Sequence, residues 1–90
     1  MVDASILQRV SLDVGNDWMC LGRQLGCSDA DLDSVKCDYH QYGQREVAYQ
    51  MLRGWHERTG NDAKLAVLAR ALVNIQRPDI ALKLEDTHQQ

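Results

Sequence analysis

The chain contains no phenylalanine, a single proline and six glycines in 90 residues. So little proline and glycine excludes a collagen-like repeat and a long disordered segment. Without phenylalanine, a core must consist of aliphatic side chains, methionine and the two tryptophans, Trp18 and Trp55. A chain of this length buries roughly 60–65% of the surface that it exposes when unfolded. With 44% hydrophobic and 26% charged residues, the composition predicts one soluble globular domain.

Long apolar runs are also absent. No run approaches the roughly 20 residues that cross a bilayer, and the opening segment MVDASILQRV has an acidic residue where a signal peptide has basic ones. The cysteines Cys20, Cys27 and Cys37 are odd in number and have no paired framework, which indicates free thiols in a reducing compartment. The sequence therefore predicts a cytoplasmic protein that does not insert into membranes.

The net charge of −3 is unevenly distributed along the chain. Residues 1–39 hold seven aspartates and three basic residues, whereas residues 40–78 hold six basic and three acidic residues. A small domain with an acidic and a basic part can present opposite faces to related partners. Nucleic acid is not an expected partner, because so acidic a chain lacks the basic footprint that phosphate binding requires.

Apolar residues recur with helical spacing in six segments, and no hairpin signal separates alternating runs. The pattern predicts helices over residues 4–12, from Trp18 to Gly26, from Ser28 to a break at 39–43, over residues 44–58, after Asn61 or Asp62, and from Pro78 onward. Capping side chains are expected at Asp3, at Asn16 or Asp17, at Asn61 or Asp62, and at Ser28 in a capping box with Asp31. Gly26 and Gly60 are expected to end helices.

Each expected helix has one apolar face. The inward residues would be Ile6 and Val10; Trp18, Leu21 and Leu25; Leu32 and Val35; Val47, Met51 and Trp55; Leu65, Leu68, Ala69 and Leu72; and Ile80, Ala81 and Leu84. Short connections make neighbouring helices antiparallel or steeply crossed. The sequence therefore predicts an all-α fold, a compact six-helix antiparallel bundle over residues 1–85, with residues 86–90 as a frayed tail.

The order of these helices and apolar residues along the chain resembles that of the death-domain family over nearly the whole sequence. The resemblance is carried by Asp17-Trp18, Leu21, Arg23-Gln24-Leu25, the string SDADLDSV at 28–35, Leu52, Trp55, Ala63, Leu68, Ala71-Leu72, Ile80-Ala81 and Leu84. Within the family, VGNDW, GRQL and DSV followed by Tyr39 are most similar to the death domain of an apoptotic adaptor. The chain departs from the usual pattern at Gly22, where alanine is common, at Lys36, where an acid is common, and at His40, where proline is common.

The resemblance implies a non-catalytic module that binds the death domain of a receptor or adaptor, with self-association possible, in an apoptotic or innate-immune signalling complex. Family members bind through several asymmetric surfaces, one of which pairs the second and third helices of one copy with the first and fourth of another. Other death-domain classes, which are ankyrin-like, netrin-receptor-like or kinase-linked, remain alternatives.

Arg23 is the strongest candidate contact residue, because it lies off the buried stripe and its guanidinium can bind a carboxylate through two hydrogen bonds. A solvated arginine in a local ion pair is the competing interpretation. Asp29, Asp31 and Asp33, with Asp38, form a candidate acidic patch, which also complements the helix dipole. The full set of candidate partner-binding residues is Arg23, Cys27, Asp29, Asp31, Asp33, Lys36, Arg45, Arg53, Arg58, Lys64, Arg77 and Asp79.

Other chemistry finds little support in the sequence. Cys37 and His40 have a C-x-x-H spacing, but no other ligands follow a standard zinc-finger pattern. No nucleophile motif or glycine-rich phosphate loop is present, so no enzymatic activity, cofactor or metal is expected. A small helical DNA-binding domain is a further alternative, although its third helix would bring Asp29, Asp31 and Asp33 toward phosphates.

Overall fold

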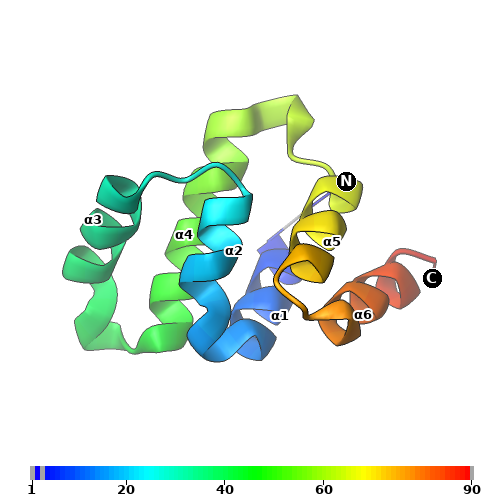
Figure 1. Ribbon diagram of the computed structural model, residues 1–90, viewed down its shortest axis with the longest axis horizontal. Coiled ribbons are helices and arrows are strands. Elements are labelled where there is room, and N and C mark those ends of the chain that lie inside the picture. Colours follow the sequence, from blue (N-terminus) through cyan, green and yellow to red (C-terminus); the bar gives the residue numbers. More distant parts are fainter. Residues whose placement is uncertain (1, 3, 90) are drawn as a thin grey trace.

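The computed structural model describes residue 2 and residues 4–89, except the side chains of residues 62 and 85–89. This part of the chain is all-α, with six α-helices and three short 3-10 turns (Figure 1). The elements are α1 (Ala4–Val14), η1 (Gly15–Asp17), α2 (Trp18–Gln24), α3 (Asp29–Tyr39), η2 (His40–Tyr42), α4 (Gln44–Thr59), η3 (Gly60–Asp62), α5 (Leu65–Asn74) and α6 (Pro78–Gln89). The predicted six-helix bundle is confirmed.

Helix α4 is the longest element, and α1, α2 and α3 pack against it. Helices α5 and α6 form a closely packed pair beside α1 and α2 (Figure 1). The α3–α4 connection lies at one end of α2, and the Arg23 end of α2 lies at the other (Figure 1). Two parts of the surface that carry candidate residues are therefore well separated.

The core consists of the predicted apolar stripes. Both tryptophans are buried, and so is Ala63 in the segment before α5. Of the predicted inward residues, Val35, Leu65 and Ala69 are only partly buried. The buried hydrophobic residues are Val2, Ile6, Leu7, Val10, Val14, Trp18, Leu21, Leu25, Cys27, Leu32, Val47, Ala48, Met51, Leu52, Trp55, Ala63, Leu68, Ala71, Leu72, Ile80, Ala81 and Leu84.

Gly22 lies on the buried side of α2, where α3 approaches closely. A Cβ atom built at this position would lie 2.6 Å from Cδ2 of Leu32 and 3.5 Å from the Met51 side chain. Glycine in a helix costs about 1 kcal/mol relative to alanine. An alanine at this position would therefore require the Leu32 side chain to shift.

The predicted signals at the C-terminal ends of α2 and α4 and at the start of α3 are confirmed. Ser28 and Asp31 form a reciprocal capping box, with Ser28 Oγ accepting from the Asp31 N–H at 3.1 Å and Asp31 Oδ2 accepting from the Ser28 N–H at 3.3 Å. Gly26 has a φ of 90° directly after α2, and Gly60 has a φ of 56° after α4. Local sequence therefore determines these helix ends.

Two cap predictions are wrong. Asp17 precedes α2 but makes no capping hydrogen bond, because its carboxylate pairs with Arg77 instead. Helix α5 is preceded by Lys64, which also makes no side-chain cap, because residues 60–62 form the turn η3. The expected cap Asp3 lies outside the described residues.

Helix α6 continues through Gln89 and so includes residues 86–89, which were expected to form a tail.

Candidate functional site

Arg23 lies in the last turn of α2 and is exposed, as the sequence predicts. Its Nε lies 3.1 Å from Oδ1 of Asp29 in the first turn of α3. The two side chains are 52% and 79% exposed, and an exposed ion pair of this kind contributes about 0–1 kcal/mol. A carboxylate from another molecule could therefore replace Asp29 at Arg23 at little energetic cost.

The aspartates of α3 face solvent. Asp29, Asp31, Asp33 and Asp38 are all exposed, and Leu32 is the fully buried side chain of this helix. Asp29 and Asp31 also lie in the first turn, where the helix dipole stabilises negative charge. Asp31 caps the helix and Asp29 pairs with Arg23. The acidic patch is therefore accessible, and two of its members also have a local structural role.

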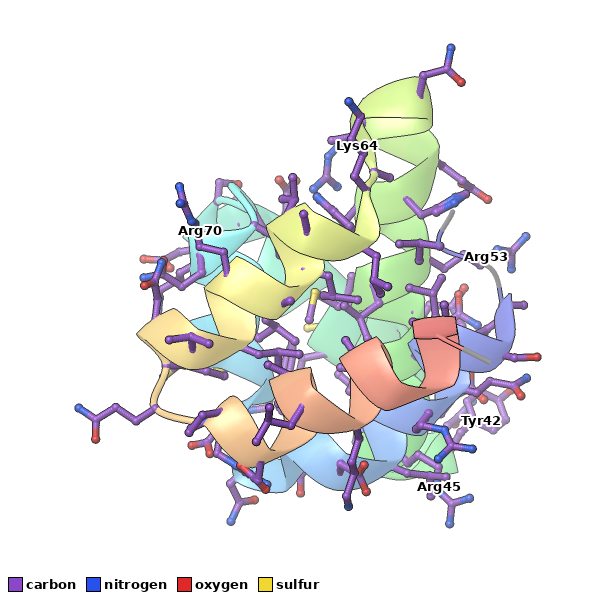
Figure 2. All side chains as sticks on the ribbon, turned by 90° about the vertical axis from the view of Figure 1, so that its right-hand side faces the viewer. Tyr42, Arg45, Arg53, Lys64 and Arg70 are labelled. Carbon is purple, nitrogen blue, oxygen red and sulfur yellow. The ribbon has the colours of Figure 1, made fainter. Side chains whose placement is uncertain are left out.

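The basic candidates do not gather in one patch. Arg45, Arg53 and Lys64, together with Arg70, extend from separate parts of the perimeter, and Tyr42 lies near Arg45 (Figure 2). Arg53 pairs with Glu57 at 3.2 Å. Among the described residues, no acid pairs with the exposed side chains of Lys36, Arg45, Lys64 and Arg70. These cations are available to an outside partner at several separate places.

Cys27 and Arg58 contact each other within the domain. Cys27 is 7% exposed, and Arg58 Nη2 donates to its sulfur at a distance of 3.1 Å. A side chain so deeply buried offers almost no surface to a partner. Its position after α2 indicates a packing role for the thiol, with the head group of Arg58 lying over it.

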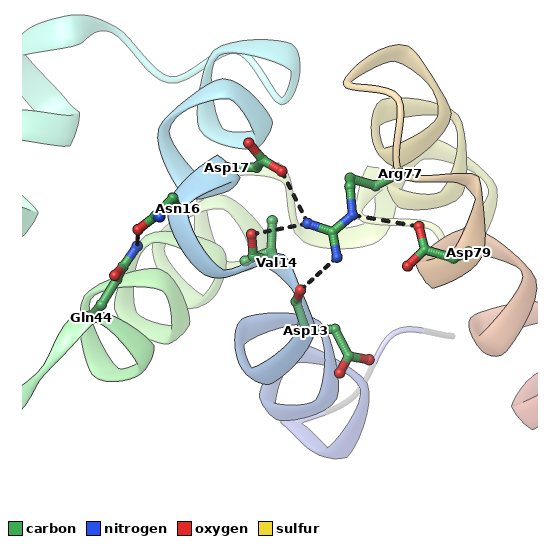
Figure 3. Close-up of polar contacts among 7 residues, drawn as sticks. All are labelled: Asp13, Val14, Asn16, Asp17, Gln44, Arg77 and Asp79. Atoms are coloured by element: carbon green, nitrogen blue, oxygen red, sulfur yellow. Dashed lines mark hydrogen bonds and ion pairs between the residues drawn. The ribbon is translucent and has the colours of Figure 1, made fainter.

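Arg77 is the centre of a polar network that joins the α5–α6 connection to the end of α1 (Figure 3). Its Nη2 donates to the Asp13 carbonyl at 2.8 Å, and its Nη1 lies 3.4 Å from the Val14 carbonyl. Nη1 also pairs with Asp17 Oδ2 at 3.0 Å, and Nε lies 3.4 Å from Asp79 Oδ1. The side chain is only 28% exposed, so the guanidinium is largely committed to contacts within the domain.

The network shifts two pKa values. The hydrogen bonds that Arg77 donates to Asp17 and then to Asp79 raise the pKa of Arg77 above its ordinary value. Loss of hydration acts to raise the pKa of Asp79, but the hydrogen bond and positive charge of Arg77 outweigh it and hold that pKa below its ordinary value. Both groups are therefore charged near neutral pH, and their ion pair is complete there.

Periodicity alone did not reveal a hollow of about 360 Å³ between α1 and α4. Gln8, Ser11 and Leu12 line it from α1, and Arg45, Glu46 and Tyr49 from α4. Leu12 is 56% exposed at the edge of this hollow. The hollow offers an apolar contact beside an arginine, and only the pairing of α1 with α4 brings the two together.

No cluster of three or more metal-ligating side chains occurs among the described residues, and Cys37 and His40 therefore lack further ligands there. Within the same part of the chain, no helix is both long and apolar enough to cross a membrane.

Comparison with known proteins gives a consistent result. A family model described as Death domain matches residues 5–88.

The chain is 34% identical over 91 residues to Tumor necrosis factor receptor type 1-associated DEATH domain protein of Oncorhynchus mykiss, covering 96% of the chain and 31% of that protein. It is 33% identical over 79 residues to Receptor-interacting serine/threonine-protein kinase 1 of Homo sapiens, covering 87% of the chain and 12% of that protein. It is also 37% identical over 71 residues to Tumor necrosis factor receptor superfamily member 10B of Mus musculus, covering 79% and 18%. The chain thus spans less than a third of the length of each of these relatives.

Proposed function

Because the chain belongs to the death-domain family, we propose that it is the interaction module of a cytosolic signalling adaptor. In this proposal it binds the death domain of a receptor or another adaptor, and it assembles an apoptotic or innate-immune signalling complex. The death domain is a non-catalytic interaction fold, and its relatives act in death signalling. The adaptor role rests on VGNDW, GRQL and DSV, which resemble the death domain of the Fas-associated adaptor.

One observation carries the proposal: four exposed aspartates lie on α3, whereas Arg45, Lys64 and Arg70 are exposed on other parts of the surface and have no ion-pair partner among the described residues. Lys36 lies on α3 beside the aspartates. The α2–α3 side presents Arg23 and the aspartates of α3. The α1–α4 side presents Arg45 beside the exposed Leu12. A second death domain can place the first kind of surface against the second kind, in a head-to-tail contact that leaves both outer surfaces free for further copies.

Each such contact would be weak, because rim charges contribute about 0–1 kcal/mol apiece. Clustering of the partner raises the effective concentration and allows several weak contacts to act together. The proposed contact residues are Arg23, Asp29, Asp31, Asp33, Lys36, Arg45, Arg53, Arg58, Lys64 and Asp79. Burial of Cys27 and the internal contacts of Arg77 make these two residues part of the scaffold in this proposal.

A charge reversal at Arg23 tests the proposal. Arg23→Glu should abolish binding to a cognate death domain, because it places a carboxylate beside Asp29 where the partner needs a cation. Arg70→Glu is the matched control, since it makes the same charge change at an exposed arginine on α5 that has no ion-pair partner among the described residues. Binding would be measured by pull-down with purified death domains of candidate receptors and adaptors, and folding by circular dichroism.

Retention of binding by Arg23→Glu, with a control of equal affinity, would contradict the proposed contact. The adaptor role has a separate test, because it depends on the remainder of the protein. A death-effector domain upstream of this segment in the full-length sequence would support it, whereas a kinase domain or ankyrin repeats would favour another death-domain class. The 33% identity to a kinase makes this second test necessary.

A further inference from the structure

A second hollow, of about 310 Å³, opens beside α2 where α3 ends and α4 begins. Trp18 of α2, Lys36 of α3, His40 of η2, and Gln44 and Val47 of α4 line it. Trp18 and Val47 are buried and form an apolar floor, whereas Lys36, His40 and Gln44 are exposed at the rim. Its volume is at the lower end of the range for small-molecule pockets, and it suits one inserted side chain.

The polar side chains at the rim differ in whether they have hydrogen-bond or ion-pair partners within the domain. His40 Nδ1 lies 3.4 Å from the carbonyl oxygen of Cys37, and Gln44 Nε2 donates to Asn16 Oδ1 at 2.8 Å. These contacts orient both side chains. Lys36, by contrast, has no hydrogen-bond or ion-pair partner among the described residues. Its ammonium group is therefore the free charge of this hollow.

The lining of this hollow contains no acidic side chain. The α1–α4 hollow differs, because Glu46 lines it together with Arg45. An unpaired ammonium next to an apolar floor is complementary to a side chain with an apolar stem and an anionic end. Among amino acids, glutamate has this form, since its methylene groups can pack on Trp18 while its carboxylate pairs with the lysine.

We propose that this hollow, called the Lys36 socket, receives a glutamate side chain of a partner protein. The proposal rests on the interaction function above and specifies which partner group Lys36 contacts. The socket is lined at the α3–α4 connection, and this connection lies at the opposite end of α2 (Figure 1) from the last helical turn, which contains Arg23. Contacts at both ends of α2 orient a partner in a way that one ion pair cannot.

The test is an NMR titration of ¹⁵N-labelled protein with N-acetyl-glutamate N-methylamide, whose side chain carries its only charge. The uncharged glutamine analogue is the matched ligand. We expect the glutamate analogue alone to shift the Trp18 indole N–H and the backbone amides of residues 36–47. Lys36→Gln should weaken this binding up to about fivefold, the equivalent of an exposed ion pair of about 1 kcal/mol, whereas Arg45→Gln should leave it unchanged.

Three outcomes would overturn the socket: equal shifts with both analogues, full binding by Lys36→Gln, or shifts at these residues with inorganic phosphate and none with the glutamate analogue. Failure of the titration while Arg23→Glu still abolishes partner binding would remove the socket and leave the proposed function intact. If instead the glutamate analogue binds as expected while Arg23→Glu retains partner binding, the Arg23 contact is removed and the carboxylate site at Lys36 remains.

Discussion

Gln76 shows how one residue is held in an unfavourable conformation by the contacts around it. It is the only described non-glycine residue with a positive φ, at 64°. The Arg77 N–H bonds the Leu72 carbonyl at 2.8 Å and the Gln76 N–H bonds the Val73 carbonyl at 3.0 Å, a pattern that ends helices with a left-handed residue. Gly26 has the same place after α2, with a φ of 90°, so α5 ends as α2 does but with a side chain in the strained position.

Gln76→Gly should stabilise the domain. Removal of the Cβ relieves left-handed strain of about 1 kcal/mol, and the greater freedom of glycine in the unfolded chain offsets part of that gain. We expect the free energy of unfolding to rise by about 0.5 kcal/mol in urea denaturation. The matched substitution Gln8→Gly, at an exposed position in the middle of α1, should lower it by about 1 kcal/mol. A loss of stability in Gln76→Gly would show that the side chain contributes more than its backbone conformation costs.

At the scale of elements, Arg77 does for α1 what a local cap does for other helices. It donates to the carbonyls of Asp13 and Val14 at the C-terminal end of α1, from a position 63 or 64 residues later. A cation at this end of a helix also interacts favourably with the helix dipole. The same side chain pairs with Asp17 and Asp79, so it holds the start of α6 against the α1–α2 junction.

Arg77→Met should destabilise the domain without changing its helical fold. The substitution keeps an apolar stem but removes the charge-assisted hydrogen bonds to two carbonyls and Asp17, and we expect a loss of about 1–3 kcal/mol in the free energy of unfolding. Arg70→Met, at an exposed arginine for which the described part of the chain offers no ion pair, should change stability by no more than about 0.5 kcal/mol. Equal unfolding midpoints for the two variants would show that the network contributes nothing.

At the scale of the whole molecule, stability should fall in acid through Asp79. Arg77 holds the pKa of Asp79 below its ordinary value, so the folded state favours the ionised carboxylate. Such a group contributes stability above its unfolded pKa, about 3.9 for aspartate, and this contribution is lost as the pH falls through the lower folded value. The unfolding midpoint of the wild type should therefore decrease as the pH falls below about 4.

Asp79→Asn is the comparison variant for this experiment, because it lacks the titrating carboxylate. Its stability should depend less steeply on pH between pH 4 and pH 2 than that of the wild type, with both followed by urea denaturation at several pH values. Parallel curves for the two proteins would mean that Asp79 does not link protonation to folding.

The sequence by itself determined the class of fold, the helix-ending glycines, the capping box and most of the core. These features depend on residues within a turn or two of each other, so spacing reveals them. Arg23 and the aspartates of α3 could likewise be placed at the surface, because they lie off the apolar stripe of their own helices.

Only the tertiary structure decided which charges remain available. In the sequence, nothing distinguishes Arg77 from the other basic residues. Folding brings it to α1 and Asp17, which are 60 residues or more away along the chain. Cys27 becomes a buried neighbour of Arg58 in the same way. The α1–α4 hollow lies between helices that are separated along the chain, and the Lys36 socket brings Trp18 of α2 to the α3–α4 connection. Local periodicity tells which way a side chain faces, but the partner that it meets depends on how the helices pack.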